Sequence, residues 1–116
     1  MSDKNKYEID AMSMLMTVAK LNNENLQYQN TAGISQNNRS SGFIPAFCDT
    51  ETGRVELSCL TEGIPAPVHL LCGVPDEWVV SRNMQGEVMA IKASVIAGFC
   101  RDGVFFTREQ AASAVV

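Results

Sequence analysis

One stretch of the chain decides the fold: Phe43-Ile44-Pro45-Ala46-Phe47-Cys48, then Asp49-Thr50-Glu51-Thr52-Gly53-Arg54, then Val55-Glu56-Leu57-Ser58-Cys59-Leu60. The first and third runs have the composition of strands, and the middle run carries turn-forming residues with a glycine near its end. In the third run the apolar residues at 55, 57 and 59 alternate with polar residues, which predicts one dry and one wet face. The stretch therefore predicts a β-hairpin.

Pro45 restricts where the first strand of this hairpin can lie. Proline has no N–H to donate to a neighbouring strand, so we expect strand 43–48 to lie at a sheet edge or at a bulge. An exposed edge is a surface to which another polypeptide can add a strand. Pro45 is therefore a candidate interaction residue.

The chain after the hairpin supplies further short elements. Residues 68–72 predict a short buried strand, and residues 75–78 predict a single helical turn opened by proline. Residues 78–82 and 87–92 flank a polar loop that closes with glycine, which predicts a strand, a turn and a second strand.

The last twenty residues carry the clearest local signals. Asp102-Gly103 between two apolar runs favours a two-residue primed turn. Thr107-Arg108-Glu109-Gln110 matches a capping box at the start of a short C-terminal helix. Taken together, the elements predict an α+β fold, in which a small antiparallel β-sheet built from hairpins is joined by an N-terminal amphipathic helix and a short C-terminal helix.

The N-terminal part differs in character from the rest. Apolar side chains recur every three or four positions over residues 7–21, which predicts a helix whose apolar side includes Met12 and Met16. Methionine adapts well to partner surfaces, so Met12 and Met16 are candidate interaction residues, with ordinary core packing as the alternative.

The following segment is poor in apolar residues. Residues 22–41 hold nine Asn or Gln in twenty positions, which predicts a flexible linker or a long irregular arm. The alternative is an ordered extension that Leu26, Tyr28 and Ile34 hold against the body. We therefore divide the chain into an N-terminal extension, residues 1–41, and a single compact α+β domain, residues 42–116.

Composition and charge exclude several classes of protein. Of the 116 residues 46% are hydrophobic, and no apolar run approaches the roughly 20 residues that span a bilayer. The N-terminus lacks the apolar core of a secretory signal, which favours the cytoplasm. The net charge is −4, and the five basic residues after position 41 are too scattered to form a basic stripe, so we do not expect a nucleic-acid binder.

His69 is the only histidine, and the four cysteines stand at positions 48, 59, 72 and 100. A metal site or a Cys–His nucleophile would have to use His69 with Cys72 or Cys48. The cysteines are ten or more residues apart, whereas zinc sites pair their ligands two to four residues apart. We therefore predict no cofactor, core packing for the thiols and a solvent-facing strand position for His69, and we keep the metal, disulfide and Cys–His interpretations as alternatives.

Two pairs of carboxylates could serve as acid and base. Asp49 with Glu51 is better explained as part of a solvated turn, and Asp76 with Glu77 as the negative charge favoured at a helix N-terminus. The sequence contains no G-x-G-x-x-G, P-loop, H-E-x-x-H or G-x-S-x-G motif.

Three longer stretches carry a resemblance, namely GFIPAF-C-DTETGRVE, APVHLL-C-GVPDEWVV and KASVIAGF-C-RDGVFFTREQA. In these stretches, which cover most of residues 42–112, the chain resembles a family of small bacterial proteins of unassigned function. The resemblance implies a compact, self-sufficient module and carries no active-site assignment. Residues 1–41 lie outside it, and three of the cysteines (Cys48, Cys72, Cys100) stand where the family is not expected to require one.

These observations lead to three functional hypotheses. The first is a non-enzymatic, cytosolic protein-interaction module of unknown partner, which includes association with a second copy of itself. The second is a small enzyme or metal site that uses His69 with a nearby cysteine. The third is an acidic accessory or inhibitor protein of a mobile genetic element, although a net charge of −4 is modest for mimicking nucleic acid.

Overall fold

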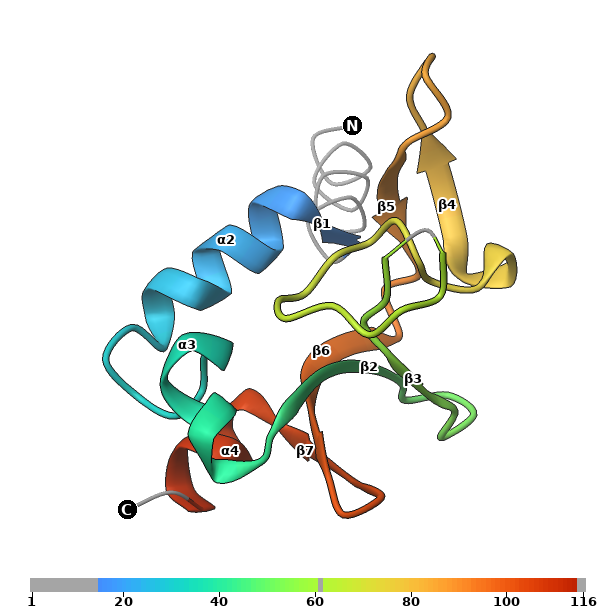
Figure 1. Ribbon diagram of the computed structural model, residues 1–116. Coiled ribbons are helices and arrows are strands. Elements are labelled where there is room, and N and C mark those ends of the chain that lie inside the picture. Colours follow the sequence, from blue (N-terminus) through green and yellow to red (C-terminus); the bar gives the residue numbers. More distant parts are fainter. Residues whose placement is uncertain (1–14, 61, 115–116) are drawn as a thin grey trace, which may run out of the picture.

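The computed structural model describes residues 15–60 and 62–114, which form two antiparallel sheets and several short helices (Figure 1). The elements, in chain order, are β1 (Met16–Thr17), α2 (Val18–Gln27), α3 (Ser35–Asn38), η1 (Arg39–Ser41), β2 (Ile44–Asp49), β3 (Val55–Leu57), η2 (Asp76–Trp78), β4 (Val79–Arg82), β5 (Val88–Ile91), β6 (Val95–Arg101), β7 (Val104–Thr107) and α4 (Arg108–Ala114). One sheet has the order β1-β5-β4 and the other β3-β2-β6-β7. The predicted α+β fold is confirmed.

The hairpin of β2 and β3 is present, but its faces are reversed from the prediction. Val55 pairs with Cys48 and has 38% of its surface exposed, whereas Ser58 is only 1% exposed. The Ser58 hydroxyl can be buried because it donates to the carbonyl of Val68 and accepts from the N–H of Leu70, each at 2.8 Å. The polar side of this run therefore faces the chain around residue 68, and the apolar side faces outward.

The expectation that Pro45 marks a sheet edge is wrong, because β2 lies between β3 and β6. The carbonyl of Pro45 accepts from the N–H of Ser58 at 2.9 Å, and the N and O atoms of a strand residue point to the same side. The missing N–H therefore faces Ser58, whose carbonyl accepts from the N–H of Ala66 at 2.7 Å. An inner strand accommodates proline here because the carbonyl opposite it has another donor.

The second hairpin, β6 with β7, confirms the predicted primed turn. Asp102 and Gly103 have φ values of 54° and 79°, as a type I′ turn requires. Arg101, which precedes the turn, pairs with Val104, which follows it. The predicted turn of helix at Asp76–Trp78 and the strand pair β4–β5 are present as well. Residues 68–72 do not form the predicted strand, since neither sheet pairs their backbone.

Of the helix predicted over residues 7–21, residues 7–14 lie outside the described residues, and Met16–Thr17 form strand β1 before α2 begins at Val18. Met16, 1% exposed, pairs with Ile91 in β1, and Thr17 caps α2 by accepting from the N–H of Lys20 at 3.1 Å. The helix continues to Gln27, through residues where the sequence predicted a linker. The polar composition of this region does not prevent order, because its amides are used: the fully buried Asn38 donates to the carbonyl of Ala32 at 2.7 Å.

Two apolar clusters hold the described elements together. The larger lies between the two sheets and α2, and it consists of Met16, Leu21, Phe47, Leu71, Trp78, Val88, Ile91, Val95 and Ala97. The smaller cluster joins the sheet β3-β2-β6-β7 to α4, and it consists of Phe43, Phe99, Phe106 and Ala111. No helix in the described part of the chain has the length and apolar character needed to cross a bilayer.

The capping box at α4 is confirmed and generates a first prediction. The N–H of Gln110 donates to the Thr107 hydroxyl at 3.1 Å, and the N–H of Thr107 donates to the Gln110 side chain at 2.9 Å. We expect Thr107→Ala to lower the free energy of unfolding by about 1 kcal/mol, because the N–H of Gln110 loses its acceptor. Urea unfolding measures this loss.

Two control variants accompany Thr107→Ala. Thr107→Ser keeps the hydroxyl and should lie close to the wild type, and Ser113→Ala removes an exposed hydroxyl from the same helix and should change the stability by less than about 0.5 kcal/mol. Equal losses in Thr107→Ala and Ser113→Ala would show that the cap is not the cause.

Candidate functional site

His69 lies inside the protein and not on the solvent face of a strand. Its ring packs edge-on against Phe47 and Phe99, with centroids 5.4 and 5.1 Å away. Its Nε2 lies 2.7 Å from the carbonyl oxygen of Gly98, and its Nδ1 lies 3.2 Å from Nη2 of Arg108. A carbonyl can only accept and a guanidinium can only donate, so Nε2 carries the proton and Nδ1 accepts.

The surroundings keep this imidazole neutral. Burial, reinforced by the positive charge of Arg108, lowers the pKa of His69 to about 4. Both ring nitrogens are occupied by protein groups, so His69 has no nitrogen left for a substrate, a metal ion or a thiol. The contacts therefore do not support the interpretation of His69 as a general base or a ligand.

Arg108 is the residue that sequence reasoning missed. It begins α4, is 3% exposed, and its guanidinium lies 5.9 Å from the ring of Phe99. Its Nε donates to the carboxylate of Glu24 at 3.1 Å, and its Nη1 donates to the carbonyl of Gly33 at 2.9 Å. Burial lowers the pKa of Arg108, and the charge of Glu24 acts in the opposite direction. In the sequence Arg108 is simply the second residue of the capping box, and no local signal distinguishes it.

The cysteines do not assemble a site with His69. All four lie in the described part of the chain as free thiols, and Cys72, expected in a buried strand, is exposed with its Sγ donating to the carbonyl of Cys59 at 3.7 Å. Burial, followed by the charge of Asp49, raises the pKa of the Cys48 thiol. Among the described residues, no three His, Cys, Asp or Glu side chains are placed so that they could hold a metal ion.

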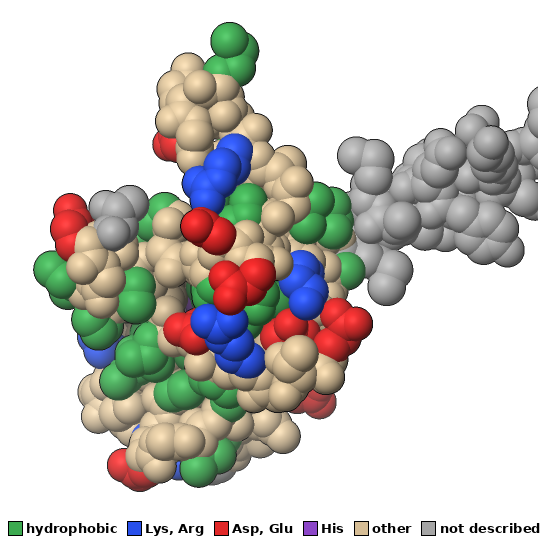
Figure 2. Space-filling view, turned by 90° about the vertical axis from the view of Figure 1, so that its right-hand side faces the viewer, with side chains coloured by type: hydrophobic (Ala, Val, Ile, Leu, Met, Phe, Trp, Pro, Cys, Tyr) green, Lys and Arg blue, Asp and Glu red, His purple; other side chains and the backbone are tan. Residues whose placement is uncertain are grey.

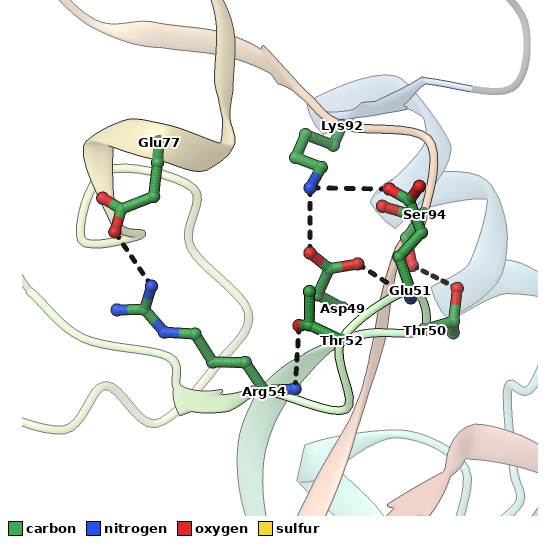
Figure 3. Close-up of polar contacts among 8 residues, drawn as sticks. All are labelled: Asp49, Thr50, Glu51, Thr52, Arg54, Glu77, Lys92 and Ser94. Atoms are coloured by element: carbon green, nitrogen blue, oxygen red, sulfur yellow. Dashed lines mark hydrogen bonds and ion pairs between the residues drawn. The ribbon is translucent and has the colours of Figure 1, made fainter.

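The Asp49 carboxylate is buried and paired (Figure 3). Its Oδ2 lies 2.9 Å from Nζ of Lys92, and its Oδ1 accepts from the N–H of Glu51 at 3.0 Å. The hydrogen bond from Lys92 is the main cause that lowers the pKa of Asp49. Lys92 also lies 3.5 Å from the Glu51 carboxylate, so this turn is held by charge pairing and was wrongly expected to be solvated throughout.

The second carboxylate pair, Asp76 and Glu77, is also bound by basic side chains of the chain, but it lies at the surface. Glu77 accepts from Arg54 at 2.9 Å, and Asp76 accepts from Arg82 at 3.0 Å. Arg54 also bridges to Glu56 at 2.9 Å. Exposed pairs of this kind contribute little to stability, and both carboxylates have arginine partners within the chain, so neither is set up as an acid or a base.

The described surface contains a groove between α2, the start of α3 and residues 68–71, which we call the α2–α3 groove. Its volume is about 450 Å³. Its lining consists of six apolar residues (Val18, Leu21, Ile34, Val68, Leu70, Leu71), four uncharged polar residues (Asn22, Asn25, Ser35, Gln36) and His69. A neighbouring groove of about 510 Å³, toward the β4–β5 hairpin, shares Val18, Leu70 and Leu71 with it, but its lining also includes Cys72, Arg82 and Glu87.

The chemistry of the α2–α3 groove is that of recognition. Its described lining contains no Lys, Arg, Asp, Glu or Cys, and the nitrogens of its one titratable side chain are used inside the protein. Such a surface offers apolar contact together with amide donors and acceptors. Its described lining holds one hydroxyl, that of Ser35, and no ionisable side chain with a free nitrogen or oxygen beside it.

Of the three residues proposed for interaction from the sequence, Pro45 and Met16 do not line the α2–α3 groove. Pro45 is buried in β2, and Met16 is 1% exposed in the core, which is the alternative that the sequence left open for it. Met12 lies outside the described residues.

Comparison of the chain with family models, with curated proteins and with solved structures found no match. The resemblance to a family of small bacterial proteins therefore stays a prediction.

The Arg108–Glu24 pair generates a second prediction. We expect Glu24→Leu to lower the free energy of unfolding by about 3 kcal/mol, because the variant leaves the buried guanidinium without its counter-ion. The double variant Glu24→Leu, Arg108→Met removes both charges and should recover part of that loss. Chemical unfolding of the single and double variants measures both values. A Glu24→Leu variant as stable as the wild type would contradict the role given to this pair.

The neutral state of His69 generates a third prediction, on pH. The unfolded chain binds a proton on His69 below a pKa of about 6.5, whereas the folded protein binds it only below about 4. Between these values the unfolded state holds the extra proton, so stability falls as the pH falls. The difference of about 2.5 units corresponds to about 3 kcal/mol.

The variant His69→Gln isolates this contribution, because glutamine can donate to the Gly98 carbonyl and does not titrate. Urea unfolding between neutral pH and about pH 4 should show the wild type losing about 3 kcal/mol more than His69→Gln. Carboxylates common to both proteins cancel in the comparison. Parallel pH profiles would show that His69 is not held neutral.

Proposed function

We propose that this protein is a non-enzymatic interaction module that binds a short polypeptide segment of a partner protein in the α2–α3 groove. The observation that carries the proposal is the composition of the groove, in which apolar and amide side chains occur without a charged one. A peptide group presents one donor and one acceptor, and so does the carboxamide of Asn or Gln. The groove therefore complements an uncharged polypeptide.

The backbone beside the groove supports the same conclusion. Residues 68–71 line it and are paired in neither sheet, although the Val68 carbonyl and the Leu70 N–H are bonded to the Ser58 hydroxyl, so a peptide would rely mainly on side-chain contacts. An extended segment can lie along such a strip with its apolar side chains in the groove. Because the four residues of this strip reach at most about 14 Å, we expect recognition of a short linear segment and not of a whole domain.

The charges and thiols support the remaining parts of the proposal. Arg54, Arg82, Lys92 and Arg108 each pair with a carboxylate of the chain, which disfavours a role in binding nucleic acid. Free thiols, with Cys72 exposed, favour a reducing compartment such as the bacterial cytoplasm.

Val18 gives the sharpest test of the groove, which is the fourth prediction. It is 49% exposed, lines both grooves, and is the first residue of α2, where a glutamate is compatible with the helix dipole. We expect a phage-displayed library of random heptapeptides, panned on the wild type, to enrich apolar sequences poor in charge. A synthetic enriched peptide should bind Val18→Glu at least about tenfold more weakly, a loss of about 1.4 kcal/mol.

Val80→Glu is the matched control. Val80 is 51% exposed on β4 and lines neither groove, so this variant should bind the peptide as the wild type does. Absence of enrichment, selection of charged peptides, or equal affinity for Val18→Glu would each overturn the proposal.

A further inference from the structure

Two of the four free thiols meet at one point of the fold, although they stand thirteen positions apart in the chain. The Sγ of Cys72 donates to the carbonyl oxygen of Cys59 at 3.7 Å. A carbonyl oxygen lies about 2.4 Å from its own α-carbon, so this Sγ is within about 6 Å of the Cα of Cys59. The α-carbons in a disulfide are about 4.4 to 6.8 Å apart, so a sulfur this close needs only a small adjustment of the two residues to form a bridge.

The glycine next to Cys72 brings the two backbones together. A Cβ at Gly73 would lie 2.3 Å from the carbonyl oxygen of Cys59 and 3.0 Å from its Cβ. Only a residue without a side chain can lie this close to Cys59, so the turn that carries Cys72 packs directly on the chain at Cys59. The contact between the two cysteines therefore involves the main chain as well as a thiol.

Neither cysteine is fixed in a sheet. Cys59 follows β3 and forms only an isolated bridge with Pro65, and residues 72–73 form a turn. The Cys59 thiol donates to the carbonyl of Leu57 at 3.3 Å, and a rotation about its Cα–Cβ bond frees it to turn toward Cys72. Both side chains can therefore adjust without the loss of a strand pair.

The other two thiols are too far from each other to form a bridge. Cys48 pairs with Ile96 across β2 and β6, and Cys100 is four positions farther along β6. This offset places the α-carbons of the two cysteines about 13 Å apart along the strands, well beyond the range of a disulfide. Burial also raises the pKa of each thiol, so both stay protonated and are poor nucleophiles.

Cys72 is the thiol that a small oxidant can reach. It is exposed, and it lines the groove of about 510 Å³ beside the β4–β5 hairpin, which projects from the body at the top of Figure 2. Cys59 is half-buried, so it lies behind Cys72 and is placed to react second. An accessible thiol with a second, resolving thiol beside it is the arrangement found in cysteines that sense oxidants.

We propose that Cys59 and Cys72 are a redox-active pair that a hydroperoxide converts into a disulfide. The Cys72 thiolate attacks one oxygen of hydrogen peroxide, the O–O bond breaks and hydroxide leaves, so the sulfur becomes a sulfenic acid. The Cys59 thiolate then attacks the Cys72 sulfur, the S–S bond forms, and the S–O bond breaks with loss of a second hydroxide. The protons that the two thiols release convert both hydroxides to water. The thiols are thereby oxidised by two electrons, and the peroxide is reduced to water.

The bridge closes a loop that includes residues 68–71, which line the α2–α3 groove. Oxidation therefore ties one wall of that groove to the end of β3. The pairing itself depends only on the two cysteines and their contacts, so it holds whether or not a peptide binds in the groove.

Intact-mass spectrometry of the full chain, reduced and then treated with hydrogen peroxide at neutral pH, tests this fifth prediction. We expect the main product to be lighter than the reduced monomer by about 2 Da, the mass of the two hydrogens lost, and dithiothreitol should reverse the change. Trypsin, which cuts after Arg54 and Arg82, leaves both cysteines in one peptide, and cleavage after Glu62 separates them. Digestion with both proteases without reductant should therefore show residues 59 and 72 linked.

Serine variants identify the two roles. Cys59→Ser should stop at the sulfenic acid, which is about 16 Da heavier and reacts with dimedone, whereas Cys72→Ser should lose the decrease in mass. Cys48→Ser is the matched control and should form the disulfide as the wild type does. Circular dichroism checks that each variant is folded.

Unfolding in urea shows whether the fold creates the pair. Cys48 is nearer to Cys59 in the chain than Cys72 is, so in urea the bridge between 59 and 72 should no longer be the main product. A preference for this pair that persists in urea would overturn the proposal. So would a wild type that keeps four free thiols or links another pair, or a Cys72→Ser variant that forms a disulfide as fast as the wild type.

Discussion

Arg108 is a cation with 3% of its surface exposed, and the arrangement of the described chain depends on satisfying it. Its partners come from segments far apart in the sequence: Glu24 in α2, Gly33 before α3, and His69 in the irregular segment. A desolvated guanidinium that loses a partner is strongly destabilising, so these segments must reach one point in space. The position of α2 relative to the sheet follows from this requirement.

The same contact determines what the only histidine does. Arg108 donates a hydrogen bond to Nδ1 of His69, and the Gly98 carbonyl accepts one from Nε2. The imidazole is therefore neutral, and it packs between the rings of two phenylalanines. A side chain that would be a first choice for acid–base chemistry is thereby removed from the surface. The α2–α3 groove, which His69 lines, therefore presents apolar and amide side chains and no charged one.

Charge and apolar area are separated on this surface. The acidic and basic side chains around the 49–54 turn and η2 are largely paired with one another.

Local features could be predicted from the sequence because their causes lie within a few residues. The Asp102-Gly103 turn needs only two residues that accept positive φ, and the Thr107–Gln110 box needs only a hydroxyl and an amide three positions apart. The predictions that failed depend on partners distant in the chain. The buried Ser58 requires residues 68–70, and the inner position of Pro45 requires β6 on one side and, on the other, a Ser58 carbonyl that accepts from Ala66.

By itself, the sequence determined the α+β class, the hairpins, their turns and the capping box of α4, since alternation and turn chemistry act over a few residues. Only the tertiary structure decided which face of β3 is covered, where α2 begins, and that His69 and Arg108 meet. The physical reason is that a period of two shows that the two faces of a strand differ, but not which one a distant segment covers. In the same way, an arginine in a capping box does not reveal that a carboxylate 84 positions away completes it.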